Sequence, residues 1–224
     1  MHEHAKGTAA EEILEAEHYQ RVISAFTNFA TRVKECTLAR HYRDWNALSE
    51  AEQGILTKYL HKLKRIEAAA NVNQSFFDAV VEYAGESVDP ENAFLVPELA
   101  TERDYENLRS TLRQLVRDWS ELGAVERGLC YPVLIECLGN FFQSSIRNKR
   151  ILIPGAGLGR LAYEIAALGY EVQGNEFSLY MLLTSQLIIN GCSQACQFSI
   201  HPFSFPLSNH FSIENSLRPV RIPD

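Results

Sequence analysis

The segment 151–160 reads ILIPGAGLGR, a short apolar run that ends in three glycines placed at every second position. The residues that follow, LAYEIAALG, return to helical spacing, so the glycines lie between an expected strand and an expected helix. Such a turn lets the backbone approach a ligand and points unpaired amide groups of the helix N-terminus towards it. The segment therefore predicts the opening of a doubly wound α/β sheet that holds a ligand at its first turn.

The spacing of the glycines separates the candidate ligands. Gly155, Gly157 and Gly159 form G-x-G-x-G, whereas a dinucleotide fingerprint needs G-x-G-x-x-G and would require glycine in place of Arg160. A phosphate-binding P-loop needs a Lys-Ser or Lys-Thr pair after its last glycine, and none follows here. G-x-G-x-G is the form found in methyltransferases that use S-adenosylmethionine, so we expect that cofactor.

An acidic residue supplies the second half of the pattern. Glu176 lies twenty-one positions after Gly155, at the end of the second expected strand, YEVQGNE. A carboxylate at this place can accept hydrogen bonds from both ribose hydroxyl groups of an adenosine ligand. The residues alone leave one alternative open, an ordinary tight turn with a solvated glutamate at the strand end.

The chain before this turn has the spacing of helices. Apolar residues in the segment 11–34 recur mostly three or four positions apart, which places them on one helix face. The segment 86–99 carries two prolines without helical periodicity and is expected to be a connector. Further helices are expected over 49–70, 71–85, 101–121 and 126–142, and after the second strand over 179–190.

Several residues predict where these helices begin and end. Ser49 and Thr101 are expected N-caps, and Gln53 lies close to the position that a capping box would use. Pro132 is compatible with a helix only near the first turn. Gly191, just past the helix over 179–190, is expected to adopt a left-handed cap conformation.

The pattern as a whole predicts an α/β protein, a helical N-terminal region followed by a partial class I methyltransferase (Rossmann-like) sheet. We expect three parts: a helical region over 1–100, helices leading into the cofactor site over 101–148, and the first half of a Rossmann-like domain over 149–224.

Three blocks of the sequence resemble one family, the N2227-type carnosine N-methyltransferases. They read LRSTLRQLVRDWSELGAVER, ILIPGAGLGRLAYEIAALGYEVQGNEFSLYMLL and SLRPVRIPD, in the family's order, and the N-terminal helices are similar too. The likeness covers nearly the whole chain, and GAGLGRLA, QGNE and the DWS helix are more specific than a glycine turn alone.

The resemblance implies a class I methyltransferase that moves a methyl group from S-adenosylmethionine to an imidazole nitrogen of carnosine, giving anserine. It implies cofactor contacts for Gly155, Gly157 and Glu176, and it matches Gln114 and Arg117 to cofactor-binding positions of the family. The last two are three residues apart and share one helix flank, so both can point into one pocket. The expected partner is a small-molecule substrate, carnosine or a related histidine-containing dipeptide.

The family continues well beyond SLRPVRIPD, and its catalytic and substrate-binding Asp, His and Tyr follow that point. We therefore expect a chain cut short after its second βα unit, with unknown catalytic residues and with weak or no activity alone. A parallel sheet of two strands with an open apolar edge agrees with this expectation. One alternative is a non-catalytic helical interaction module with a remnant nucleotide-binding turn, pairing with a full-length copy. Another is a nicotinamide dehydrogenase fragment, which the glycine spacing disfavours. A homodimer is also expected.

The composition limits which binding partners and which cellular compartment are expected. A net charge of −7 and the lack of clustered basic residues argue against nucleic-acid binding. No segment approaches the roughly 18 apolar residues that span a bilayer, and the N-terminus has no targeting pattern. Five scattered cysteines favour a reducing compartment, the cytosol and also the nucleus. Cys192 and Cys196 lack enough neighbouring ligands for zinc, so no metal is expected.

Overall fold

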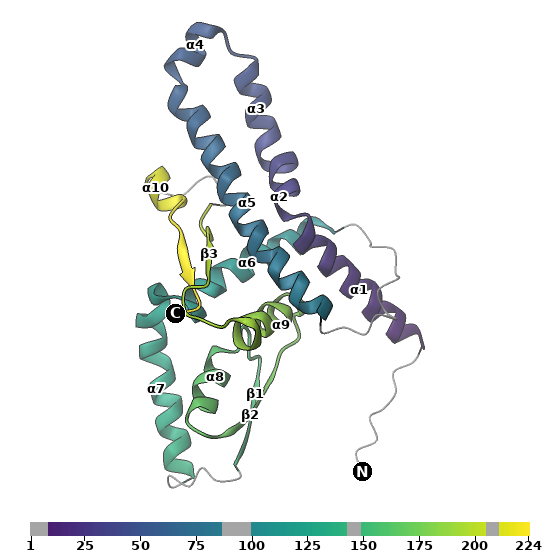
Figure 1. The fold of residues 1–224 in the computed structure, drawn as a ribbon, viewed down its shortest axis with the longest axis vertical. Helices are drawn as coiled ribbons and strands as arrows, with labels where there is room; N and C mark the ends of the chain where they lie inside the picture. Colours follow the sequence, from purple (N-terminus) through teal and green to yellow (C-terminus); the bar gives the residue numbers. More distant parts are fainter. Residues whose placement is uncertain (1–8, 87–99, 143–148, 205–210) are drawn as a thin grey trace.

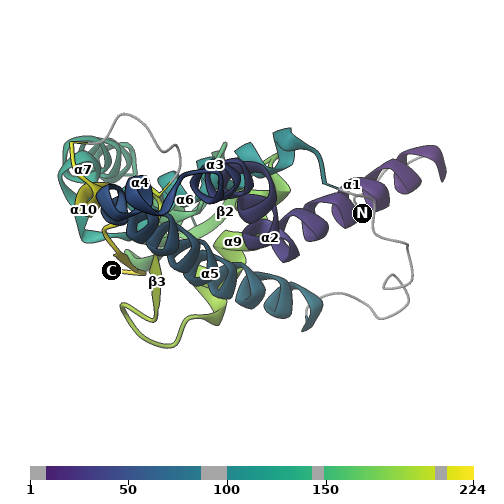
Figure 2. The same ribbon diagram turned by 90° about the horizontal axis from the view of Figure 1, so that it is seen from above.

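The computed structural model describes residues 9–86, 100–142, 149–204 and 211–224. Helices form a long arm at one end of the molecule and surround a small parallel sheet at the other (Figure 1). Seen from above, α7 and the beginning of α1 lie at opposite ends (Figure 2). The elements are α1 Ala9–Thr27, α2 Phe29–Arg32, η1 Val33–Leu38, α3 Ala39–Asn46, α4 Glu50–Ile55, α5 Thr57–Glu86, α6 Glu102–Trp119, η3 Glu121–Gly123, α7 Ala124–Phe141, β1 Arg150–Pro154, α8 Arg160–Ala167, β2 Glu171–Asn175, α9 Leu179–Gln186, η4 Leu187–Gly191, β3 Phe198–Ile200, α10 Ile213–Ser216 and β4 Val220–Ile222.

The helical region is built on α5, along which α1 and α2 pack. Its centre is a group of aromatic side chains that are at most 1% exposed: Phe26, Phe29, Phe76 and Phe77. Phe77 meets Phe26 and Phe29 edge to face, with ring centroids 5.3 Å and 5.0 Å apart. The predicted amphipathic stripe over 11–34 is confirmed as a core face from Val22 to Val33, whereas Leu14 is 63% exposed and the expected single helix is interrupted at Asn28.

The expected caps are confirmed, with one correction. Ser49 caps α4, but its capping-box partner is Glu52, whose carboxylate accepts the Ser49 backbone N–H at 2.8 Å. The prediction of Gln53 is wrong by one position, because the third helical residue is the one that faces back to the cap. Gln53 instead donates to two carbonyl groups that precede the helix. Thr101 caps α6, and Asp104 accepts its backbone N–H at 2.7 Å.

The boundaries of the helices expected over 49–70 and 71–85 are wrong: the first is divided after α4, which ends at Ile55, and α5 runs without a break from Thr57 to Glu86. Asparagine often ends a helix because its side chain competes for backbone hydrogen bonds. Here the fully buried Asn73 is satisfied elsewhere: it donates to the carbonyl of His201 at 3.1 Å and accepts the His201 N–H at 2.7 Å. The helix therefore continues, and this pair of bonds ties it to the segment after β3.

Pro132 lies in the interior of α7, so the prediction that it lies near a first turn is wrong. A proline there cannot donate to the carbonyl four residues earlier, which belongs to Gly128. Gly128 is exposed and carries no side chain, and open space surrounds it, so water can reach the freed carbonyl. This exposure lets α7 tolerate the proline.

The expected strand, turn, helix, strand and helix are confirmed by β1, α8, β2 and α9. β1 and β2 pair in parallel, from Arg150 opposite Glu171 to Pro154 opposite Asn175. Within the described residues this sheet has two strands. The structure thus confirms a helical region followed by a small methyltransferase-like sheet. The division of the chain into three parts at residues 100 and 148 stays a prediction. The connector expected over 86–99 lies, from residue 87 on, outside the described residues.

A second pair of strands was not anticipated from the sequence. β3 and β4 are antiparallel, and they pack against α5 and α6. Ile200 and Ile222 are fully buried, and Phe198 meets Phe76 of α5 with centroids 5.3 Å apart. This pair joins the helical region to the end of the described chain.

Gly191 does not adopt the predicted left-handed conformation, because it belongs to the π-helical turn η4 and has no positive φ. Its small size serves packing instead. A Cβ at this position would lie 2.9 Å from Leu187 and 3.0 Å from the Tyr83 ring of α5. Glycine therefore permits the close approach of η4 to α5.

Candidate functional site

The glycine turn has the backbone conformation that the sequence pattern requires. Gly155, Gly157 and Gly159 have φ values of 64°, 57° and 77°, a left-handed region in which other residues are strained. The turn is closed by hydrogen bonds from Ala156 N–H to the Asn175 carbonyl and from Gly159 N–H to the Ala156 carbonyl, both 2.9 Å. The turn therefore follows β1 directly and is held against the end of β2.

Glu176 follows β2 and faces this turn. Its carboxylate accepts the backbone N–H groups of Gly157 at 2.8 Å, Phe177 at 2.8 Å and Ser178 at 2.9 Å. Burial would raise the pKa of this carboxyl group, but the three N–H bonds outweigh it and the pKa is lowered overall. Glu176 is therefore ionised at neutral pH and fixed at the sheet edge.

Helix α6 brings two further predicted residues to the same place. Its apolar stripe, which includes Leu108, Leu112 and Leu115, is fully buried or nearly so. Gln114 and Arg117 lie beside this stripe, on the flank that faces the glycine turn. The oxygen of the Gln114 side chain lies 3.9 Å from the position that a Cβ on Gly157 would occupy.

A cavity of about 620 Å³ lies between α6, α7 and the glycine turn, and all five predicted residues line it: Gln114, Arg117, Gly155, Gly157 and Glu176. Its volume is in the range of small-molecule sites. The wall also contains residues that the sequence analysis missed, among them Asp118, Glu126, Arg127 and Tyr131. Burial is the main reason why the pKa of Tyr131 is raised, so its hydroxyl group is neutral.

Arg117 is paired with its neighbour in sequence. Its Nε donates to Oδ1 of Asp118 at 2.7 Å and its Nη2 to Oδ2 at 3.1 Å. The Asp118 side chain is 2% exposed and that of Arg117 is 46% exposed. The hydrogen bonds to Asp118 raise the pKa of the Arg117 guanidinium, so Arg117 is a cation.

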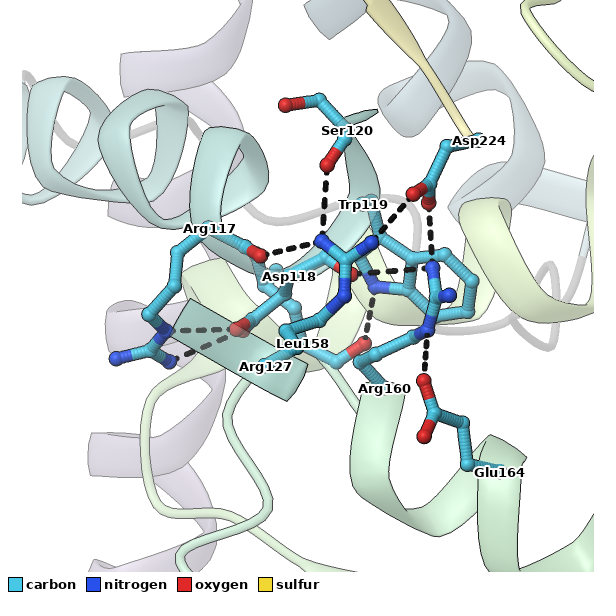
Figure 3. Close-up of polar contacts among 9 residues, drawn as sticks. All are labelled: Arg117, Asp118, Trp119, Ser120, Arg127, Leu158, Arg160, Glu164 and Asp224. Carbon is cyan, nitrogen blue, oxygen red and sulfur yellow. Dashed lines mark hydrogen bonds and ion pairs between the residues drawn. The ribbon is translucent and has the colours of Figure 1, made fainter. Parts of the chain in front are cut away.

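The end of α6 is held by a second arginine, Arg127 of α7 (Figure 3). Its Nη1 donates to the carbonyl groups of Arg117 at 2.6 Å and Ser120 at 2.9 Å. Its Nη2 donates to Asp224, just after β4. Arg127 is 7% exposed and thus satisfies carbonyl groups that the helix leaves without intrahelical donors.

A third arginine, Arg160 at the start of α8, completes the polar cluster in Figure 3. It donates to Asp224 at 2.5 Å, to Glu164 at 2.8 Å and to the Asp118 carbonyl at 3.3 Å. Its guanidinium lies 4.9 Å from the ring centroid of Trp119. The cluster therefore joins α6, α7, α8 and the end of β4.

The tryptophan at the end of α6 reaches the glycine turn itself. Trp119 Nε1 donates to the carbonyl of Leu158, inside the turn, at 2.9 Å. The Asp224 N–H donates to the Trp119 carbonyl at 3.1 Å. The DWS block, part of the family resemblance, thus fixes the turn relative to α6, a role that no local pattern reveals.

The described part of the chain holds no group of three or more His, Cys, Asp and Glu side chains placed to hold a metal ion. None of its helices combines the length and the apolar character needed to cross a membrane.

Comparisons with known proteins agree on one family. The family described as carnosine N-methyltransferase matches residues 96–224. The carnosine N-methyltransferase of Mus musculus is 37% identical over 98% of this chain and 57% of its own length. That of Dictyostelium discoideum is 35% identical over 94% of this chain and 49% of its own, and carnosine N-methyltransferase unmet of Drosophila melanogaster is 30% identical over 94% and 52%.

The chain thus spans about half the length of the curated relatives it matches. Nothing in these comparisons favours the alternative of a non-catalytic helical module. The match covers the glycine turn, Glu176 and the α6 residues of the cavity together. The chain therefore belongs to the carnosine N-methyltransferase family.

Proposed function

We propose that this chain binds S-adenosylmethionine in the cavity between α6, α7 and the glycine turn and serves in methyl transfer to an imidazole nitrogen. One observation carries the proposal: five residues expected to contact the cofactor, from two α6 positions to Glu176, line one cavity. The family supports the same cofactor, because methyltransferases in general take their methyl group from S-adenosylmethionine.

Each wall of the cavity suits a different part of this cofactor. Glu176 is ionised and can accept hydrogen bonds from the ribose hydroxyl groups. Gly155, without a side chain and with open space around it, allows close approach of the backbone. Gln114 and Arg117 on α6 offer an amide and a guanidinium to the methionine end. When bound, the cofactor supplies an activated methyl group on its sulfonium.

Binding of S-adenosylhomocysteine to the purified chain, measured by isothermal titration calorimetry, tests the cofactor proposal. We expect a dissociation constant of about 1–100 μM, in the affinity range of ordinary small-molecule binding. Glu176→Ala should weaken binding at least about tenfold, because hydrogen bonds to a charged group are worth about 1.5–3 kcal/mol.

A matched control is Glu171→Ala, which removes an exposed glutamate from the other end of β2, where it pairs with Arg150. This control should bind like the unchanged chain. The proposal fails if the unchanged chain does not bind at millimolar ligand, or if the two glutamate variants bind equally well.

The substrate proposal, carnosine or a related histidine-containing dipeptide, follows the names of the relatives. We expect slow transfer of labelled methyl groups to carnosine, well below about 1 per second, because the described residues carry no assigned catalytic base. β-Alanylalanine, which lacks the imidazole, should stay unlabelled. Label on β-alanylalanine would contradict this choice of substrate.

The remaining expectations about binding partners and cellular location stay predictions. They are the lack of nucleic-acid and membrane binding, the pairing of two copies, and residence in the cytosol or nucleus. The net charge of −7 supports the first of these, because nucleic-acid binding relies on clustered positive charge.

A further inference from the structure

Asp118 is an almost fully buried carboxylate in the wall of the cavity, with a side chain that is 2% exposed. Each of its two oxygens accepts one hydrogen bond from Arg117, at 2.7 Å and 3.1 Å. A bidentate pair of this kind fixes the plane of the guanidinium as well as its place. Asp118 thus determines how Arg117 is oriented.

Arg117 keeps donors for a ligand. A guanidinium has five N–H groups, and the bonds to Asp118 use two of them. The side chain is 46% exposed and lines the cavity. Figure 3 shows it pointing away from Arg127, Arg160 and Asp224, so the cluster leaves its outer edge open.

The backbone of Arg117 is held as firmly as its side chain. Arg127 donates to the Arg117 carbonyl at 2.6 Å, and its other nitrogen bonds Asp224. Arg160 donates to the Asp118 carbonyl at 3.3 Å. Both residues of the pair are therefore anchored from α7 and α8, which is the arrangement expected of a preorganised binding group.

The cofactor has one anionic group, the α-carboxylate of its methionine end. Glu176, which also lines the cavity, would repel that group, whereas the guanidinium of Arg117 matches a carboxylate in charge and in shape. We infer that Asp118 is a positioning residue, which holds Arg117 in the orientation that binds this α-carboxylate. The inference rests on the proposed function.

Two ligands separate this role from a general structural one. S-Adenosylhomocysteine carries the amino-acid end, and 5′-deoxy-5′-methylthioadenosine lacks it. We expect the unchanged chain to prefer the first by about tenfold or more in calorimetric dissociation constants, since a charge-assisted bond is added. Asp118→Asn should lose most of this preference and bind methylthioadenosine within about twofold of the unchanged chain, because an amide offers one acceptor oxygen in place of two.

Arg117→Lys is the second variant, and its half-exposed side chain makes it safe for folding. Lysine keeps the charge but cannot form the planar fork, so the preference for S-adenosylhomocysteine should fall here too. In the double variant, the loss of preference for S-adenosylhomocysteine should be no greater than in Asp118→Asn alone, because both changes remove the same interaction. Glu106→Gln, an exposed carboxylate on the same helix, is the matched control and should change neither affinity.

The outcomes are distinguishable. Equal loss for both ligands in Asp118→Asn, or an unchanged preference, overturns the inference while the proposed function stands. Failure of the unchanged chain to bind either ligand overturns both. If Asp118→Asn does not fold by circular dichroism, Arg117→Lys decides: a folded lysine variant that keeps the full preference overturns the inference, and one that loses it supports the inference.

Discussion

Thr184 in α9 is fully buried, and its hydroxyl group has no hydrogen-bond partner among the described residues. A buried hydroxyl without a partner costs free energy, because it gave up its bonds to water. Thr111 in α6 is equally buried, but its hydroxyl donates to the Asn107 carbonyl at 2.9 Å. The two threonines therefore form a natural pair for comparison.

Thr184→Val should raise the free energy of unfolding by about 1 kcal/mol, because valine keeps the shape and removes the unpaired hydroxyl. Thr111→Val, the matched control, should lower it by about 1 kcal/mol, because it removes a hydrogen bond that is made. Urea unfolding followed by circular dichroism measures both. A loss of stability in Thr184→Val would show that its hydroxyl is satisfied after all.

The residues of the candidate site differ in how far the sequence predicts them. Gly155, Gly157 and Glu176 follow from local spacing, because a turn with positive φ needs glycine and the acid lies at a strand end. Gln114 and Arg117 came from the family resemblance, since polar residues beside an apolar stripe are usually just solvated. Their contact with the cofactor stays a prediction, while their place in the cavity is observed.

Asp118, Arg127, Arg160 and Asp224 could not be found from local pattern. Asp224 lies 97 positions from Arg127 and 64 positions from Arg160 in the sequence. Such pairs depend on how the elements pack, and a charged residue in a helix is most often exposed. Only the three-dimensional arrangement shows that these four residues meet at the end of α6.

At the scale of elements, apolar periodicity and capping residues were sufficient to predict the helices and strands whose structure is determined locally. The parallel pair β1–β2, the helices α8 and α9 that follow these strands, and the caps at Ser49 and Thr101 agree with the sequence. The errors occur where tertiary contacts override local preference. Asn73 lets α5 continue because His201, just after β3, satisfies its side chain, and Gly191 serves packing against Tyr83 instead of a left-handed cap.

The strands β3 and β4 were missed because each has only three residues. So short a segment shows no alternation that could be told from a loop. Their apolar side chains are buried by tertiary contacts, since Ile200 and Ile222 are fully covered once the two strands pair and pack on α5 and α6. A strand of this kind is a consequence of the fold more than of its own sequence.

At the scale of the whole molecule, two polar contacts help to join the helical region to the part of the chain that holds the sheet, besides the packing of α9 and η4 on α5. Asn73 ties α5 to the segment after β3, and Asp224 ties the segment after β4 to Arg127 and Arg160. Both contacts run through the β3–β4 pair, so this pair couples α5 to the helices that line the cavity. Disturbing Asp224 should therefore affect the stability of the whole described chain.

Asp224→Asn should lower the free energy of unfolding by about 2 kcal/mol, because it leaves the buried Arg127 guanidinium without a carboxylate. The loss is smaller than for a fully buried pair, since Asp224 is 22% exposed and Arg127 keeps two carbonyl partners. Urea unfolding followed by tryptophan fluorescence measures it, because Trp119 lies in the cluster and Trp45 in the helical arm.

The control for this change is Glu214→Gln, which breaks an ion pair with Arg65 between side chains that are 74% and 37% exposed. Solvent screens such a pair, so its removal should change the free energy of unfolding by less than about 0.5 kcal/mol. Added salt should reduce the control's small effect further and leave that of Asp224→Asn nearly unchanged, because buried charges are screened less. Equal effects in the two variants would mean that Asp224 is one more surface charge and that the coupling of the two regions runs through apolar packing alone.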